Sequence, residues 1–278
     1  MQPSLAPRLE WNAVIDVLRA VWNYRFFIGS SVRNDLRARV ARSQLGAAWV
    51  VLQPLAQVAI FSLVLSEVLA AKLPGTTNKH AYAIYLMAGS MAWALFSEIL
   101  TRCLSIFVGN AGLLKKMAFP RICLPIIAVG ASLLNNLLLF LAMVAIFALL
   151  GHPPTAAFAW LPLLTILTAA LSLGLGLLLG VINVFVRDVG QVMTIVLQLW
   201  FWLTPIVYMP DILPARYLPW LSLNPLLPIV RAYQRVILYG ESPVPGSGLL
   251  YPSLLALALL VAALLLFRRS SPDMVDVL

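Results

Sequence analysis

The feature that constrains this chain most is a run of 65 residues, Ile122 to Val186, that contains no Asp, Glu, Lys or Arg. A helix needs about 20 apolar residues to cross the hydrocarbon core of a bilayer, so the run is long enough for at least two crossings. Of the 278 residues 62% are hydrophobic and 10% are charged, against about 25% charged residues in soluble domains. The sequence therefore predicts an all-α integral membrane protein.

Hydropathy and helix-breaking residues divide the chain into a cytoplasmic amphipathic region, residues 1–46, and a transmembrane domain, residues 47–278. Six spans are predicted in the second part, at about residues 49–71, 82–108, 122–150, 160–185, 189–208 and 249–267. Two prolines at Gly151 to Pro154 remove backbone donors and restrict the residues before them. A tight hairpin turn is expected there, between the third and fourth spans.

The region before the first span predicts a helix that lies along the membrane surface. Val32, Leu36 and Val40 recur at helical spacing, and the basic residues around them are Arg33, Arg37, Arg39 and Arg42. A basic helix with an apolar stripe is typical of the headgroup region. The simplest interpretation is a topology anchor, because basic residues are retained on the cytoplasmic side.

Basic residues also orient the spans. With the N-terminus inside, the inner segments contain thirteen Lys and Arg residues and the outer segments contain five. The positive-inside rule therefore places both termini in the cytoplasm. An island between the second and third spans, Asn110 to Arg121, reads NAGLLKKMAFPR and would face the cytoplasm together with Arg187-Asp188. Two such elbows form a docking surface for a soluble partner, which a self-sufficient channel does not require.

The proline-rich segment from Pro210 to Gly248 precedes the last span. Its apolar centre, Tyr217 to Val230, is too short to cross the bilayer and is typical of re-entrant helices. Non-helical backbone at that depth survives only against protein or a water-filled cavity. The segment is therefore predicted to line a pathway on the outer side.

Known catalytic signatures are not found in the sequence. A P-loop requires a Gly-Lys pair, which does not occur, and His80 and His152 have no nearby Cys, His or acidic residues at ligand spacing. We therefore expect no cofactor, no metal and no catalytic residue in this chain. Gly176 and Gly180 are four residues apart within a span, which favours close helix packing.

Two groups of residues inside the spans have two interpretations each. Glu98 and Arg102 are spaced to pair on one helix face, and the pair is either structural or involved in gating. The aromatic residues are either packing and interfacial residues or a sugar-stacking channel lining. This second group consists of Trp93, Phe96, Trp200, Phe201, Trp202 and Tyr208.

Several short motifs, taken in order, resemble the membrane subunit of type-2 ABC exporters for polysaccharides, the family of O-antigen and teichoic-acid export permeases. They are Arg33 to Arg39, Leu45 to Trp49, Gln53-Pro54, Leu113 to Arg121, Phe185 to Asp188, Thr204 to Tyr208, Leu223 to Pro225 and Phe267 to Arg269. The resemblance implies a homodimer in the bacterial inner membrane, with a channel at its interface. It also implies two cytosolic ATP-binding subunits that hold ATP and Mg.

The resemblance further implies where partners bind. The segment coupled to the ATPase would contain Leu113, Leu114, Lys115, Lys116, Phe119, Pro120 and Arg121, to which the cytoplasmic elbow adds Arg187 and Asp188. The cargo would be a lipid-linked glycan on a polyprenyl diphosphate. Arg37, Arg39 and Arg42 suit an anionic diphosphate through bidentate hydrogen bonds, although they equally suit ordinary anionic membrane lipids. No nucleic-acid partner is expected.

Two other classes of function remain open from the sequence. One is a stand-alone channel or ion-coupled transporter, which should show repeats with broken helices and ionisable midplane sites. The other is a membrane enzyme acting on lipid-linked sugars, which should offer acid–base or metal residues near the interface. The identity of the glycan, O-antigen, teichoic acid or another surface polymer, is also open.

Overall fold

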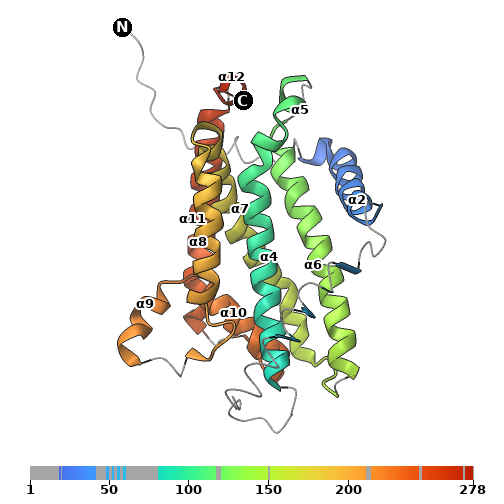
Figure 1. Cartoon of the computed structure of the whole chain (residues 1–278), viewed down its shortest axis with the longest axis vertical. Helices are drawn as coiled ribbons and strands as arrows, with labels where there is room; N and C mark the ends of the chain where they lie inside the picture. The colour runs from blue at the N-terminus through green and yellow to red at the C-terminus, as the bar shows by residue number, and fades with distance from the viewer. Residues whose placement is uncertain are drawn as a thin grey trace.

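The computed structural model describes most of the chain, and within that part it is helical without β-strands (Figure 1). The described residues are 19, 21–41, 48–49, 52, 55–56, 59–60, 81–116, 120–149, 151–210, 214–243, 246–271 and 273–277. The first predicted span, residues 49–71, therefore lies almost entirely outside the described residues, as does most of the N-terminal stretch before residue 21.

Four helices in the described ranges are long and apolar enough to cross a membrane. They are α4 (Ala81–Gly109), α6 (Cys123–Leu149), α7 (Leu161–Phe185) and α11 (Leu250–Ser270). The second, third, fourth and sixth predicted spans are confirmed as helices of spanning length. The hairpin between α6 and α7 turns at Gly151, whose φ of 77° lies in the left-handed region that glycine adopts without strain.

The fifth predicted span is shorter than expected. Helix α8 (Asp188–Leu203) has 16 residues, which corresponds to about 24 Å against a hydrocarbon core of about 30 Å. It ends because Thr204 precedes Pro205, and a residue before proline is pushed out of the helical region. Thr204 is accordingly extended, with ψ of 128°. The sequence prediction, which ran to residue 208, overlooked this break.

Side chains from other helices satisfy the irregular backbone that follows α8. The Tyr82 hydroxyl donates a hydrogen bond of 2.5 Å to the Val207 carbonyl oxygen, and Tyr85 donates to the carbonyl of Tyr208 at 3.3 Å. The Gln234 amide donates to the Pro205 carbonyl at 3.3 Å. Since an unpaired carbonyl in an apolar interior is costly, these three bonds let the chain leave the helix while buried.

Two short helices, α9 (Leu218–Ser222) and α10 (Leu226–Gln234), occupy the proline-rich segment. Helix α10 is mostly buried against α4 and continues into a π-helical turn, Arg235–Tyr239, which ends at Gly240 with φ of 65°. Short helices are thus present where re-entrant helices were predicted. Their depth in a membrane stays a prediction.

Helix α2 (Arg25–Ala41) lies beside α6 on the flank of the bundle (Figure 1). The two helices approach closely at Gly130, because a Cβ added there would be 3.0 Å from the Val32 side chain. Val32 is buried, whereas most of the rest of α2 is exposed. Of the predicted apolar stripe, Val32 is buried and Leu36 is half-buried, while the side chain of Val40 lies outside the described residues.

Helix α7 is the centre of the bundle, and it packs against both α4 and α11. Its glycines permit this. A Cβ on Gly176 would be 2.9 Å from the Cys103 Cβ of α4, and a Cβ on Gly180 would collide with the Cys103 carbonyl oxygen. A Cβ on Gly174 would be 2.9 Å from the Leu260 amide nitrogen of α11. The predicted role of Gly176 and Gly180 in close packing is confirmed.

We expect Gly180→Ala to destabilise the protein by about 1–3 kcal/mol, because the added methyl group meets backbone that cannot move aside. The measurement is the thermal unfolding midpoint of the purified protein in detergent. Gly29→Ala is the matched control, since nothing lies within 4 Å of its added Cβ. Equal midpoints for the two variants would contradict the packing assignment.

Candidate functional site

One end of the bundle gathers the elbows that the sequence assigned to the cytoplasm. Helix α5 (Ala111–Lys116), the α7–α8 junction and α12 (Met274–Val277) all lie at this end, which we call the coupling end (Figure 1). The hairpin at residues 151–160 and helices α9 and α10 lie at the opposite end. The predicted grouping of segments into two sides is therefore correct. Which side is cytoplasmic stays a prediction.

An apolar cluster fixes α5 to the rest of the bundle. Leu114 is buried and Leu113 half-buried against residues of α4, α6, α7, α11 and α12. Within this cluster the rings of Phe107 and Phe267 stack, with their centroids 5.7 Å apart. Helix α5 contacts α4 and α12 directly, so a displacement of α5 would act on these two helices and, through the cluster, on the others.

The charged residues of the same segment differ in their surroundings. Lys115 is exposed on α5, whereas the Arg121 guanidinium donates hydrogen bonds to the carbonyl oxygen of Ser271 and, at 2.8 Å, to its hydroxyl. Pro120 accepts the Cys123 amide at 2.9 Å at the start of α6. Phe119 and the side chain of Lys116 lie outside the described residues. Arg121 thus ties the segment to the end of α11, and Lys115 presents charge to solvent.

The second elbow is held by a residue that sequence reasoning missed. Arg187 and Asp188 are both exposed between α7 and α8, and Asp188 lies in the first turn of α8, where a negative charge favours the helix dipole. The Asn183 amide donates to the Leu104 carbonyl of α4 at 3.0 Å and accepts the Gly190 amide at 2.9 Å. The signal in the sequence that could have identified Asn183 is an asparagine near the end of an otherwise apolar helix.

A polar cluster crosses three helices halfway along the bundle. Arg102 donates to Glu98 at 2.9 Å, as the spacing predicted, and also to Asp35 of α2 at 3.1 Å. The Asn135 amide of α6 donates to the same Glu98 oxygen at 2.7 Å. The pair is therefore part of a network that connects α2, α4 and α6. This favours the structural interpretation of Glu98 and Arg102.

Arginines of α2 lie along a groove of about 770 Å³ between α2 and α6. Arg33 and Arg37 line it together with Arg25, while Phe26, Val32 and Leu134 contribute its apolar part. The side chain of Arg39, and Arg42 altogether, lie outside the described residues. Of the three arginines predicted to receive a headgroup, the structure therefore describes only Arg37 fully, on a basic and partly apolar groove.

Most of the predicted aromatic residues pack against one another between α4 and α8. Trp93 contacts Phe201 edge-on at 5.5 Å between centroids, and Phe96 contacts Trp200 at 5.2 Å. Phe96 is fully buried, whereas Trp202 is exposed on α8. Within one chain the packing interpretation is thus supported for Trp93, Phe96 and Phe201.

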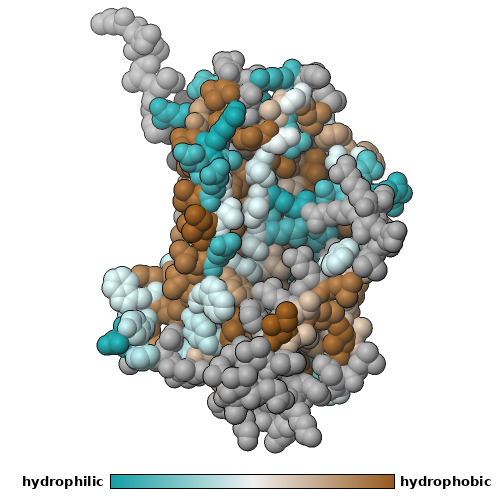
Figure 2. Space-filling model, in the orientation of Figure 1, coloured by the Kyte–Doolittle hydropathy of each residue, from teal (hydrophilic) through white to brown (hydrophobic). Residues whose placement is uncertain are grey.

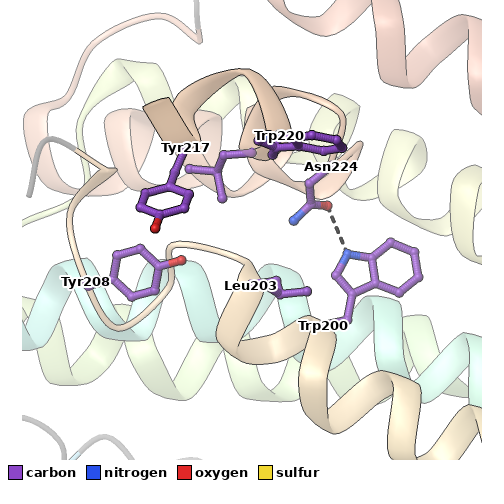
Figure 3. A pocket seen from close by; sticks show the side chains of 7 residues that line it. Trp200, Leu203, Tyr208, Tyr217, Trp220 and Asn224 are labelled. Atoms are coloured by element: carbon purple, nitrogen blue, oxygen red, sulfur yellow. Dashed lines mark hydrogen bonds between the residues drawn. The ribbon is translucent and has the colours of Figure 1, made fainter. Parts of the chain in front are cut away.

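A pocket of about 480 Å³ lies between the end of α8 and helix α9 (Figure 3). Trp200, Leu203 and Tyr208 line it from one side, and Tyr217, Trp220, Leu221 and Asn224 line it from the other. Of these residues, Trp200 and Tyr208 were predicted as lining. Tyr217 and Trp220 were not named individually, but they lie in the proline-rich segment that was predicted to line a pathway.

Asn224 joins the parts of this pocket. Its side-chain oxygen accepts the Trp200 indole N–H at 3.0 Å and the Leu226 amide at 3.0 Å (Figure 3). Its amide donates to the Thr204 hydroxyl at 2.9 Å. One side chain therefore connects the end of α8 to the start of α10.

The sequence matches the ABC-2 type transporter family over residues 28–238, and the chain belongs to this family. Relatives include the O-antigen export system permease protein RfbA of Klebsiella pneumoniae, 27% identical over 78% of this chain and 82% of the relative. RfbA of Myxococcus xanthus is 28% identical over 93% of this chain and 95% of its own length. The polysialic acid transport protein KpsM of Escherichia coli is 24% identical over 86% and 92%.

We expect Arg102→Ala to lower the free energy of unfolding by about 1–3 kcal/mol, because it leaves Glu98 and Asp35 without their shared cation. Thermal unfolding of the purified protein measures this. Arg235→Ala is the control, since the Arg235–Glu241 pair is 40% and 54% exposed and such pairs contribute about 0–1 kcal/mol. Equal losses in both variants would rule out a stabilising role for the Asp35–Arg102–Glu98 network.

Proposed function

We propose that this chain is the membrane permease subunit of an ATP-driven exporter that moves a polysaccharide out of the cytoplasm. Membership of the ABC-2 family supports transport driven by a separate ATP-binding subunit. The similarity to O-antigen and polysialic acid transport proteins, over most of their length, supports a glycan as cargo. The chain itself is then a transport component and not an enzyme.

The observation that carries the proposal is the construction of the coupling end. Helix α5 exposes Lys115 on one side and inserts Leu114 into an apolar cluster on the other. An ATP-binding subunit that pushes on α5 would therefore act on α4 and α12 directly, and on α7 and α11 through the apolar cluster. A channel that opens without a partner would not need a helix such as α5 that transmits force from a partner to the bundle.

The finer features of the proposal follow from the same role. Two copies of this chain would enclose the path for the glycan. Two ATP-binding subunits, holding ATP and Mg, would dock at the coupling end, on the cytoplasmic side of the bacterial inner membrane. A polyprenyl diphosphate carrier would approach α2 from the cytoplasmic leaflet. The guanidinium groups of Arg33 and Arg37 suit its phosphates because both present planar, bidentate donors.

The aromatic pocket suits the outer end of this path. Rings offer flat apolar faces with polar edges, on which sugar rings stack during passage. Trp220 is 75% exposed and Tyr217 is 47% exposed, so both are accessible to a passing chain. The Trp200–Asn224 hydrogen bond connects this pocket to α8, and hence to movements of the bundle.

Replacing Lys115 and Lys116 together by Glu is expected to abolish both copurification with the ATP-binding subunit and export, because the docking charge is reversed. Copurification is measured by affinity capture of the tagged permease, and export by the amount of surface polysaccharide. Arg235→Glu, at the opposite end, controls for the reversal of a basic residue elsewhere on the chain. Normal complex formation and export by the double variant would refute the coupling assignment.

A further inference from the structure

The chain continues past helix α11 into a short segment that lies at the coupling end. Its described residues are Ser271 and Asp273 to Val277, of which the last four form helix α12. A helix of one turn has almost no stability by itself, because isolated helices of fewer than about 12 residues are marginal in water. The position of α12 therefore depends on its contacts with the rest of the protein, which include contacts with α5 and α7.

Met274 is the residue that anchors α12. Its side chain is fully buried, at 0% exposure, and it belongs to the same apolar cluster as Leu114 of α5 and Phe267 of α11. By contrast, Asp273 and Val277 are exposed. One side of the segment thus packs into the bundle, and the other side faces solvent.

A second contact joins this segment to the coupling segment, by which we mean Leu113 to Arg121. The Arg121 guanidinium donates hydrogen bonds to the carbonyl oxygen of Ser271 and, at 2.8 Å, to its hydroxyl. Ser271 directly follows α11, and the last carbonyls of a helix have no partner within the helix. The helix dipole also favours a cation at this position. Arg121 therefore caps α11 and at the same time attaches the coupling segment to it.

The two contacts hold the coupling segment at both of its ends. The cluster around Met274 holds Leu114, and Ser271 holds Arg121, while residues 117–119 lie outside the described part of the chain. Helix α5 also contacts α4, from which only Asn110 separates it. Contact with the adjacent helix alone would allow α5 to pivot about this junction. The two contacts from the distant segment after α11 fix its orientation.

The outer side of this arrangement is open to solvent and carries charge. Lys115, Arg269 and Asp273 are exposed, and Figure 2 shows teal, hydrophilic residues among brown, apolar ones at the coupling end. A soluble partner that docks on α5 therefore binds beside the segment after α11. Because Met274 and Ser271 connect that segment to the coupling segment, a movement of α5 is also passed to the end of α11.

We propose that the segment after α11, Ser271 to Val277, is a clamp that holds the coupling segment in the position to which the ATP-binding subunit binds. The inference rests on the proposed function, and it assigns a role in docking to residues outside the coupling segment itself. Met274 and Ser271 act through α5 and Arg121, so they are positioning residues that do not need to touch the partner. The competing explanation is that both contacts only stabilise the bundle.

Hydrogen–deuterium exchange of the purified protein in detergent separates these two explanations. Met274→Gln brings a polar amide into the apolar cluster, so α12 should detach and the amides of α5 should exchange about tenfold faster or more, with those of α7 unchanged. Val277→Gln makes the matched change at a position that is 48% exposed, and it should leave both helices unchanged. No acceleration in α5, or equal acceleration in α5 and α7, would overturn the clamp.

Arg121→Gln tests the second contact with a milder substitution, because Arg121 is half-buried at the surface of the bundle. Loss of its bonds to Ser271 should accelerate exchange in the coupling segment by about threefold or more. Arg269→Gln, which removes an exposed arginine from the last turn of α11, is the matched control and should have no such effect. Equal exchange in these two variants would overturn the role of Arg121 in the clamp.

Docking is measured by titrating the permease with the ATP-binding subunit that copurifies with the parent chain. If the coupling segment of Met274→Gln occupies the binding position for about a tenth of the time, the affinity for this subunit falls about tenfold, because only that position binds it. Met274→Leu keeps an apolar side chain of similar volume in the cluster and should retain the parent affinity. Equal affinities of these two variants would overturn the role of the clamp in docking. If no ATP-binding subunit copurifies with the parent chain, the proposed function fails, and the exchange results still decide whether the segment holds α5.

Discussion

The close approach of α4 and α11 to helix α7 is the constraint on which the rest of the structure depends. Without Cβ atoms at Gly174, Gly176 and Gly180 the three backbones come into contact, and any larger residue there would separate them. That contact brings Phe107 and Phe267 together at the coupling end, where the pair supports α5. The position of the element that would meet an ATPase is thus a consequence of packing in the middle of the bundle.

The break at Pro205 ends helix α8 and determines the course of the backbone that follows it. Once α8 stops, its following carbonyls need donors, and Tyr82, Tyr85 and Gln234 supply them. These bonds attach the segment that follows α8 to both α4 and α10, and α9 then forms one wall of the aromatic pocket. A proline placed within a predicted span therefore shapes the end of the bundle opposite the coupling end, and polar side chains of α4 and α10 stabilise it.

Much of this arrangement was predictable from local patterns. Apolar runs predicted six spans, of which four are helices of spanning length in the described residues. Residue spacing predicted the Glu98–Arg102 pair, and small residues four apart predicted the packing of Gly176 and Gly180. The missed features involve residues far apart in the chain. Asp35 is 67 residues from Arg102, and Asn135 is 37 residues from Glu98, so no pattern of spacing connects them. The end of α8 was missed because hydropathy outweighed the restriction that Pro205 imposes.

The sequence by itself indicated a membrane protein, located four of its spanning helices and showed that a cationic elbow interrupts them, because hydropathy and charge act locally. The order of its short motifs also indicated the transporter family, which the match over residues 28–238 confirms. Only the tertiary structure decided which aromatic residues pack and which line a pocket, and that Arg121 binds Ser271 while Lys115 stays exposed. Contacts of this kind join residues far apart in the chain, 150 positions for Arg121 and Ser271, so no local pattern fixes them.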